Sequence, residues 1–137
     1  MSATIPQYDS VINVCKDIFL KKAKDYGASW RVLRTISVID QIFIKALRIR
    51  NLQELKTQKV ADDIPTEFIG IINYAAIGLI QLQLKSAIDT DLGTEEVEKL
   101  YNEKISGAKE TMRDKYHDYG EAWREVSMES FVDLILA

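Results

Sequence analysis

The sequence predicts an all-α protein, on three observations. Apolar residues recur at intervals of three and four positions in every long segment between the polar or glycine- and proline-containing stretches. No segment sustains the alternation of apolar and polar residues that is typical of a half-buried strand. Residues 8–44 align without a gap on residues 101–137, at an offset of 93, with 12 identities among 37 pairs. Because solenoid units span only about 20–50 residues, this offset indicates a duplicated helical unit.

Composition and charge narrow the class of protein. The 137 residues are 47% hydrophobic and 28% charged, values typical of a soluble globular protein with a real core. A net charge of −3 argues against a general nucleic-acid binder. The single cysteine, Cys15, excludes an intramolecular disulfide and fits a reducing cytoplasm. Residues 1–6 do not have the pattern of a signal peptide, so we expect a cytoplasmic protein.

The first two helices are expected on either side of a glycine. The first covers residues 6–26, because proline is tolerated at a first helical position and an apolar stripe follows it. Gly27 is expected to end this helix as a left-handed C-cap. The second helix covers residues 37–51, with Ser37 as its N-cap and Asp40 three residues later as a variant of the capping box.

Pro65 starts a third helix, which is apolar nearly all round over residues 68–84. Only Asn73, Gln81 and Gln83 interrupt its apolar character. Seventeen residues are short for a membrane span of about 20 residues, so the pattern favours a central core helix and no membrane partner.

The remaining segments define the domain organisation. Residues 54–63 are polar and are expected to form a loop, and residues 89–93 mark the boundary between the copies. A fourth helix follows over residues 94–119, and Gly120 ends it as Gly27 ends the first. The sequence therefore predicts a first repeat at 1–92 and the start of a second, truncated repeat at 93–137.

An incomplete second copy has a consequence for assembly. The chain ends inside the apolar segment 131–137, whose side chains at Val132, Leu134, Ile135 and Leu136 need cover. Large exposed apolar patches are uncommon on monomers. We therefore expect a homodimer.

The motif Asp-Tyr-Gly-x-x-Trp-Arg occurs twice, at residues 25–31 and 118–124. One interpretation is structural: a glycine ends a helix, and the tryptophan of the following turn fills the core. The other is functional: Tyr26 and Trp30 stack on a nucleobase, while Arg31 or Arg34 faces a phosphate. The residues alone favour the structural interpretation and leave the second open.

Three polar side chains are candidate metal ligands. Asp40 has no second acid three or four residues away on its helix, so further ligands would have to come from elsewhere. Glu67 and Asn73, on the third helix, could reach the same cavity. A buried amide must be hydrogen-bonded or it costs about 1–3 kcal/mol, so Asn73 could equally pin one helix to another.

Lys45 and Arg48 lie one turn apart on the second helix, beside its apolar face. Such a pair could bind a triphosphate through charge-assisted hydrogen bonds, or both side chains could extend from the edge of the core into solvent. No P-loop, GxGxxG, CxxC, HExxH or GxSxG pattern is present to indicate another chemistry.

Three stretches taken together resemble a known family: residues 24–30, 40–49 and 67–75. They are similar to a bacterial and phage domain of unknown function that is labelled nucleotide-modification-associated. The resemblance covers nearly all of the first copy and the visible part of the second. It implies a relationship to the MazG-like all-α nucleoside triphosphate pyrophosphohydrolases, and so a MazG-like helical bundle.

The resemblance also implies a chemistry. Those enzymes bind magnesium through acids on two helices and cleave between the α and β phosphates. By this resemblance Asp40 falls near the first acidic helix and the pair Asn73-Tyr74 near the second. Gly70 stands where a related sequence would carry an acid. The expected site is therefore short of two acids.

The function expected from these observations is nucleotide binding, with magnesium-dependent pyrophosphohydrolase activity as an open question. Asp40, Glu67 and Asn73 would hold Mg²⁺, and the nucleotide would contact Tyr26, Trp30, Arg31, Lys45 and Arg48. The alternative is a non-catalytic helical interaction and oligomerisation module. The two differ in whether Asp40, Glu67 and Asn73 converge on one pocket.

Overall fold

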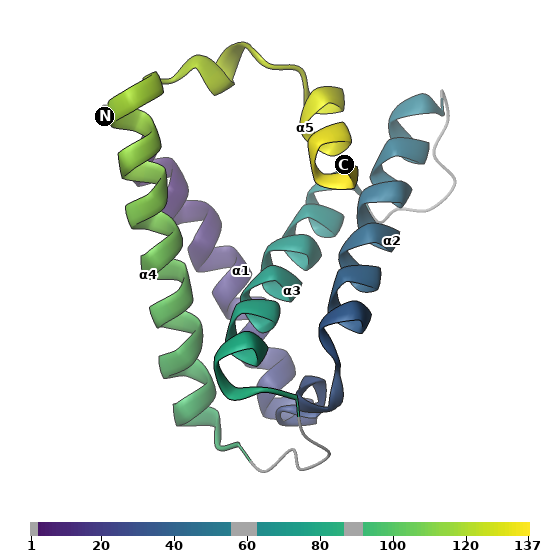
Figure 1. Ribbon diagram of the computed structural model, residues 1–137, viewed down its shortest axis with the longest axis vertical. Coiled ribbons are helices and arrows are strands. Elements are labelled where there is room, and N and C mark those ends of the chain that lie inside the picture. The colour runs from purple at the N-terminus through teal and green to yellow at the C-terminus, as the bar shows by residue number, and fades with distance from the viewer. Residues whose placement is uncertain (1–2, 56–62, 87–91) are drawn as a thin grey trace.

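The computed structural model describes residues 3–55, 63–86 and 92–137. These residues form five α-helices and two short 3₁₀ helices and include no strand, which confirms the all-α prediction (Figure 1). In chain order the elements are α1 (Thr4–Tyr26), η1 (Ser29–Val32), α2 (Thr35–Glu54), α3 (Ile64–Leu84), α4 (Thr94–Tyr119), η2 (Ala122–Glu125) and α5 (Met128–Leu136).

The predicted helix starts are correct at some positions and wrong at others. α3 begins next to Pro65, and the side chain of Asp63 accepts a hydrogen bond from the backbone N–H of Thr66 at 3.1 Å. In contrast, α2 begins at Thr35 without a side-chain cap, so the predicted capping by Ser37 is wrong. Ser37 lies inside the first turn because Arg34 is the N-cap, and its carbonyl accepts the hydrogen bond from the N–H of Val38 at 3.1 Å.

α3 is the central helix of the fold. It contacts α1, α2 and α4, and its buried side chains include Ile71, Ala76, Ile77 and Ile80. By length and composition alone it could cross a membrane, as a core helix of this kind often could. Its contacts on three sides agree with the prediction of a core helix.

Two hydrophobic cores hold the helices together. The larger core joins α1, α2, α3 and α4, with Phe19, Val38, Ile77 and Tyr101 among its buried residues. The smaller core joins α2, α3 and α5 through four buried residues, Ala46, Ile49, Ile71 and Val132. Residues from both predicted repeats therefore take part in each core.

The local structure repeats at the offset of the sequence repeat. α1 ends at Tyr26 and α4 at Tyr119, and the two 3₁₀ helices and the starts of α2 and α5 follow at the same offset of 93 residues. The helices that correspond at this offset also pack together: α1 contacts α4, and α2 contacts α5 (Figure 1). The boundaries predicted at 54–63 and 89–93 lie largely outside the described residues.

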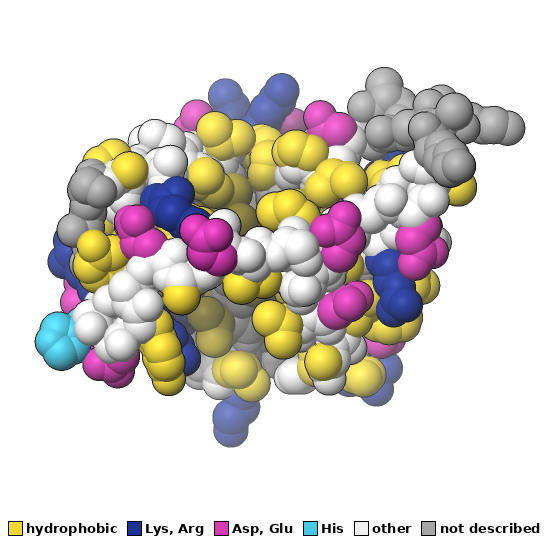
Figure 2. Space-filling model, turned by 90° about the horizontal axis from the view of Figure 1, so that it is seen from above, with side chains coloured by type: hydrophobic (Ala, Val, Ile, Leu, Met, Phe, Trp, Pro, Cys, Tyr) yellow, Lys and Arg dark blue, Asp and Glu magenta, His cyan; other side chains and the backbone are white. Residues whose placement is uncertain are grey.

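The apolar C-terminal segment finds partial cover within the chain. Val132 is fully buried and Leu136 packs on the same core, while Leu134 and Ile135 are exposed. Figure 2, which views this end of the molecule from above, shows hydrophobic side chains across its middle with acidic side chains among them. α2 and α3 thus cover part of the apolar C-terminal surface that led us to expect a homodimer.

Candidate functional site

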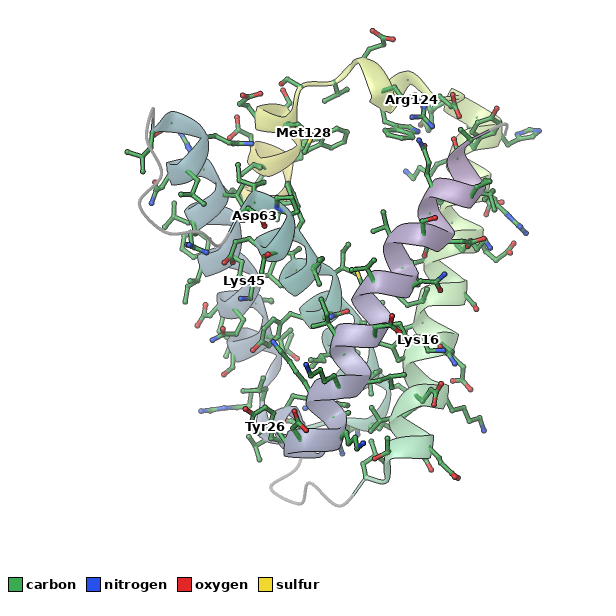
Figure 3. The ribbon with its side chains drawn as sticks, turned by 180° about the vertical axis from the view of Figure 1, so that it is seen from behind. Lys16, Tyr26, Lys45, Asp63, Arg124 and Met128 are labelled. Atoms are coloured by element: carbon green, nitrogen blue, oxygen red, sulfur yellow. The ribbon has the colours of Figure 1, made fainter. Side chains whose placement is uncertain are left out.

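A pocket of about 450 Å³ lies between the C-terminal half of α1, η1, α2 and α3. Its size falls in the range of about 300–1,000 Å³ that is usual for small-molecule sites. Five of the predicted site residues line it: Tyr26, Trp30, Lys45, Glu67 and Asn73. Figure 3 looks onto this side of the molecule, with Tyr26 at the end of α1 and Lys45 on α2.

Aromatic side chains form much of the pocket wall. Phe19, Tyr26, Trp30 and Tyr74 all line it. Tyr26 is 72% exposed, whereas Trp30 is half-buried against the larger core, with its ring centroid 6.4 Å from that of Phe19. The tryptophan therefore fills the core, as the structural interpretation predicts, and also borders the pocket.

Two cations of α2 contact the carboxylate of Glu67 on α3 beside the pocket. Glu67 is buried, and its carboxylate forms a hydrogen-bonded ion pair with the guanidinium of Arg48. Its other oxygen lies 3.7 Å from Lys45 Nζ, which is also 5.8 Å from the ring centroid of Tyr74. Arg48 thus holds the carboxylate firmly, while Lys45 makes a longer contact and borders the open pocket.

Gly70 explains how Lys45 reaches the pocket. A Cβ atom at this position would lie 2.8 Å from both Cδ and Cε of Lys45 and 3.3 Å from Nζ. Any side chain here would therefore displace the lysine. The family resemblance predicts an acid at position 70. A glycine is needed there because the side chain of Lys45 passes directly over it.

Asn73 is held by hydrogen bonds to two other helices. Its Nδ2 donates to the backbone carbonyl of Cys15 at 3.1 Å, and its Oδ1 accepts from the hydroxyl of Tyr101 at 2.9 Å. Burial raises the pKa of the Tyr101 hydroxyl, which remains a donor at neutral pH. These hydrogen bonds join α3 to α1 and α4. They give Asn73 the helix-pinning role that the sequence left open.

Gln81 fixes the turn that carries Trp30. Its buried amide donates to the backbone carbonyls of Trp30, Arg31 and Leu33 at 2.8–3.2 Å. The Arg31 guanidinium in turn donates to Gln81 Oε1 and to the carbonyl of Lys85. Arg31 is therefore tied to the end of α3 and does not line the pocket.

Asp40 lies away from the pocket. It is exposed on the outer face of α2, near Phe43 and Leu47, and does not line the cavity. The structure thus brings Glu67 and Asn73 together and leaves Asp40 apart. In the described part of the chain, no group of three His, Cys, Asp or Glu side chains could hold a metal ion.

The donor set does not fit the predicted magnesium site. Mg²⁺ takes six oxygen ligands in near-ideal octahedral geometry. Within the pocket Glu67 is already paired with two cations, and the oxygen of Asn73 is engaged by Tyr101. The described residues of the pocket therefore do not supply a protein-held site for Mg²⁺.

Two side chains that line the pocket and could contact a ligand were not predicted to be binding residues. Lys22 lines the pocket from α1, and Tyr74 lines it from α3. Lys22 carries a signal in the sequence, because its counterpart at the repeat offset is Lys115. Tyr74 has no counterpart at the repeat offset and was named only through the family resemblance, beside Asn73; its place in the pocket depends on how α3 packs against α2.

The fold and the pocket define an all-α domain with a cationic, aromatic-walled cavity between its helices. The sequence model of nucleotide modification associated domain 1 matches residues 22–82 and 115–137. The chain belongs to this family, a domain of unknown function. The second matched segment begins 93 residues after the first, at the offset of the repeat. Searches of curated proteins and of solved structures found no significant match.

Proposed function

We propose that the pocket between α1, α2 and α3 binds a nucleotide. The observation that carries the proposal is the meeting of aromatic side chains and two lysines in one cavity of suitable size. The base would stack against Tyr26, Trp30 and Tyr74, since aromatic rings favour stacked or edge-to-face contacts. Phosphate oxygens would accept charge-assisted hydrogen bonds from Lys22 and Lys45.

The two α2 cations that contact Glu67, Lys45 and Arg48, have different roles in this proposal. Arg48 is committed to Glu67 through a hydrogen bond, whereas the contact between Lys45 and Glu67 spans 3.7 Å. An entering phosphate could therefore take Lys45 without leaving the buried carboxylate unpaired. In this proposal Arg48, which was predicted to contact the nucleotide but does not line the pocket, positions Glu67, and Lys45 binds the ligand.

The proposal is one of binding. The MazG-like relationship and pyrophosphate cleavage remain expectations from resemblance, and the described residues that line the pocket include one carboxylate, that of Glu67. Any Mg²⁺ would enter with the nucleotide, coordinated mainly by its phosphates and water. Titrations with and without Mg²⁺ therefore separate binding of the free nucleotide from binding of its metal complex.

The test is isothermal titration calorimetry with nucleoside mono-, di- and triphosphates. Lys45→Gln should weaken binding by about 10- to 100-fold, because a hydrogen bond to a charged group contributes about 1.5–3 kcal/mol. Lys21→Gln is the matched control, since Lys21 is exposed on α1 and does not line the pocket. No heat of binding with any nucleotide would contradict the proposal.

Gly70→Ala provides a second variant that leaves every charged group in place. The new methyl group would push Lys45 out of its present path. Alanine is also favoured over glycine inside a helix by about 1 kcal/mol, so the variant should remain folded. We expect weaker nucleotide binding without loss of thermal stability. Unchanged affinity would show that the position of Lys45 is irrelevant.

Self-association is a second candidate, favoured by an apolar stripe on the outer face of α2. Ile36, Ile39, Phe43 and Leu47 follow helical spacing and are all exposed. At the repeat offset, Ile39 and Phe43 correspond to Val132 and Leu136, which pack on this chain's own core. We propose a second copy of this chain as the partner of the stripe.

Light scattering tests this second candidate. The chain should be a dimer, and Phe43→Glu should convert it to a monomer by placing a charge on the stripe. Asn102→Glu adds the same charge on the exposed face of α4 and should leave the dimer intact. A monodisperse monomer before any substitution would rule out self-association.

A further inference from the structure

A second pocket lies at the opposite end of the molecule, where α4 meets the start of α1. It has a volume of about 370 Å³. Its lining residues are Thr4, Met112, Lys115, Tyr116, Tyr119, Gly120 and Trp123. Figure 3 labels Tyr26 beside the first pocket at one end and Arg124, next to Trp123, at the other.

The lining of the second pocket repeats one wall of the first. Six of its seven residues, all except Thr4, correspond at the offset of 93 to residues that line the first pocket. Lys115, Tyr119 and Trp123 are the counterparts of Lys22, Tyr26 and Trp30. The same turn geometry positions both walls, because Gly27 and Gly120 have φ values of 61° and 63°.

The opposite wall differs between the two pockets. In the first it is formed by α2 and α3, which supply Lys45, Glu67 and Tyr74. In the second it is formed by Thr4 at the start of α1. Tyr116 stands where the first pocket has the smaller Ala23, so an additional aromatic ring takes part of the space.

A polar network fixes the rim of the second pocket. Glu121 accepts a hydrogen bond from the hydroxyl of Thr4 and pairs with Arg124 at 3.2 Å. Arg124 also donates to Gln7 Oε1 at 2.7 Å, and its guanidinium lies 4.3 Å from the ring centroid of Trp123. The tryptophan is therefore held in place although it is 43% exposed.

Lys115 is the available cation of this pocket. Within the described ranges no carboxylate lies within 4.0 Å of its Nζ, which is 5.8 Å from the ring centroid of Tyr119. An ammonium group beside exposed aromatic rings suits a ligand that combines an anionic group with an aromatic ring system.

We infer that this chain binds a second ligand of the same class, a nucleotide, at Lys115, Tyr119 and Trp123. The inference rests on the proposed function of the first pocket. Binding here should be weaker because, among the described residues, Thr4 alone replaces the wall that would correspond to Lys45 and Tyr74.

The two tryptophans allow each pocket to be followed separately. Trp30 lines only the first pocket and Trp123 only the second, and the chain has no other tryptophan. Trp30→Phe leaves Trp123 as the reporter, and Trp123→Phe leaves Trp30. Each full-length variant is titrated with nucleoside mono- and triphosphates, with emission excited near 295 nm and corrected against N-acetyltryptophanamide.

In the Trp30→Phe background, we expect saturable quenching of Trp123. Adding Lys115→Gln should raise the apparent Kd about 10-fold or more, whereas adding Lys22→Gln should leave it unchanged. In the Trp123→Phe background, Lys22→Gln should weaken binding and Lys115→Gln should not.

The outcomes separate the two proposals. Saturation of Trp30 without saturation of Trp123 would overturn the second site and leave the proposed function standing. A silent Trp30 would overturn the proposed function, and with it the inference that rests on it. Quenching of Trp123 that Lys115→Gln does not weaken would also overturn the second site.

Discussion

The side chains of Asn73 and Tyr101 join three helices through two hydrogen bonds. Asn73 belongs to α3, Tyr101 to α4, and the carbonyl of Cys15 to α1. All three residues are buried. A buried polar group is tolerated only when it is satisfied, so each member of this network depends on the others.

Tyr101→Phe tests this network. The substitution keeps the ring and its stacking on Phe19 at a centroid distance of 4.4 Å but leaves Asn73 Oδ1 without its donor. We expect a loss of about 1–3 kcal/mol in the free energy of unfolding, measured by urea denaturation. Tyr26→Phe is the control, because Tyr26 is largely exposed. Equal stability of the two variants would contradict this role for Asn73.

At the scale of the elements, two glycines end the helices that begin each repeat motif. Gly27 and Gly120 have positive φ with ψ values of −152° and −139°, a region that is nearly exclusive to glycine. A left-handed C-cap was predicted at Gly27; its φ is positive as such a cap requires, but its ψ of −152° lies outside the left-handed helical region. The sharp exit it permits places Trp30 against the core, as Gly120 places Trp123 at the rim of its pocket.

Gly27→Ala and Gly120→Ala should each destabilise the protein by about 1–3 kcal/mol because of backbone strain. Gly107→Ala is the matched control with the opposite sign. Gly107 lies inside α4 with nothing near the position of a Cβ, so alanine there should stabilise by about 1 kcal/mol. Thermal denaturation of the three variants checks the prediction. The same sign for all three would show that the turns tolerate a side chain.

Asp63, the N-cap of α3, gives stability a pH dependence. Hydrogen bonds from the backbone N–H and hydroxyl of Thr66 lower the pKa of its carboxyl below the usual 3.8. Because the folded-state pKa is the lower one, the ionised cap stabilises the protein above the unfolded pKa. That contribution is lost as the pH falls through the folded pKa.

Asp63→Asn keeps a capping oxygen but cannot titrate. Unfolding followed by circular dichroism from pH 6 to pH 2 should show the wild type losing stability relative to this variant at the acidic end. Asp114→Asn, at an exposed position of α4, should follow the wild type. Parallel curves for wild type and Asp63→Asn would contradict the effect of the cap.

At the scale of the whole molecule, the second repeat segment completes the packing of the first. α5 covers the smaller core through Val132, which is 0% exposed, while its neighbour Leu134 is 69% exposed. The equivalent face of α2, at Ile39, is 52% exposed. One repeat position is therefore buried in one copy and exposed in the other.

Val132→Ala should destabilise the protein by about 2 kcal/mol, from the lost burial of two methyl groups and the remaining cavity. Leu134→Ala removes more carbon from the same helix but should change stability by less than about 0.5 kcal/mol, because its side chain is exposed. Chemical denaturation of both variants measures the difference. Similar losses of stability in the two variants would mean that the burial of Val132 does not hold α5 against the smaller core.

The sequence predicts more of the elements than of the site. Apolar spacing located α1, α3 and α4, and proline and glycine marked their ends, since these signals are local. The start of α2 was wrong because a serine and an aspartate three residues apart can form a capping box or simply lie within a helix. Asp40 and Glu67 could not be separated by spacing, because the rotation of α2 decides which of its faces meets α3.

The sequence by itself determined that the chain is all-α and that its Tyr-Gly-x-x-Trp turn occurs twice, since periodicity and repetition are properties of the chain. Only the tertiary structure decided which polar residues share a cavity. Packing of α2 against α3 placed Lys45, Glu67 and Tyr74 together, buried Asn73 under Tyr101 and turned Asp40 outward. Those relations arise between helices distant in sequence, where hydrophobic burial fixes orientation and no local pattern records it.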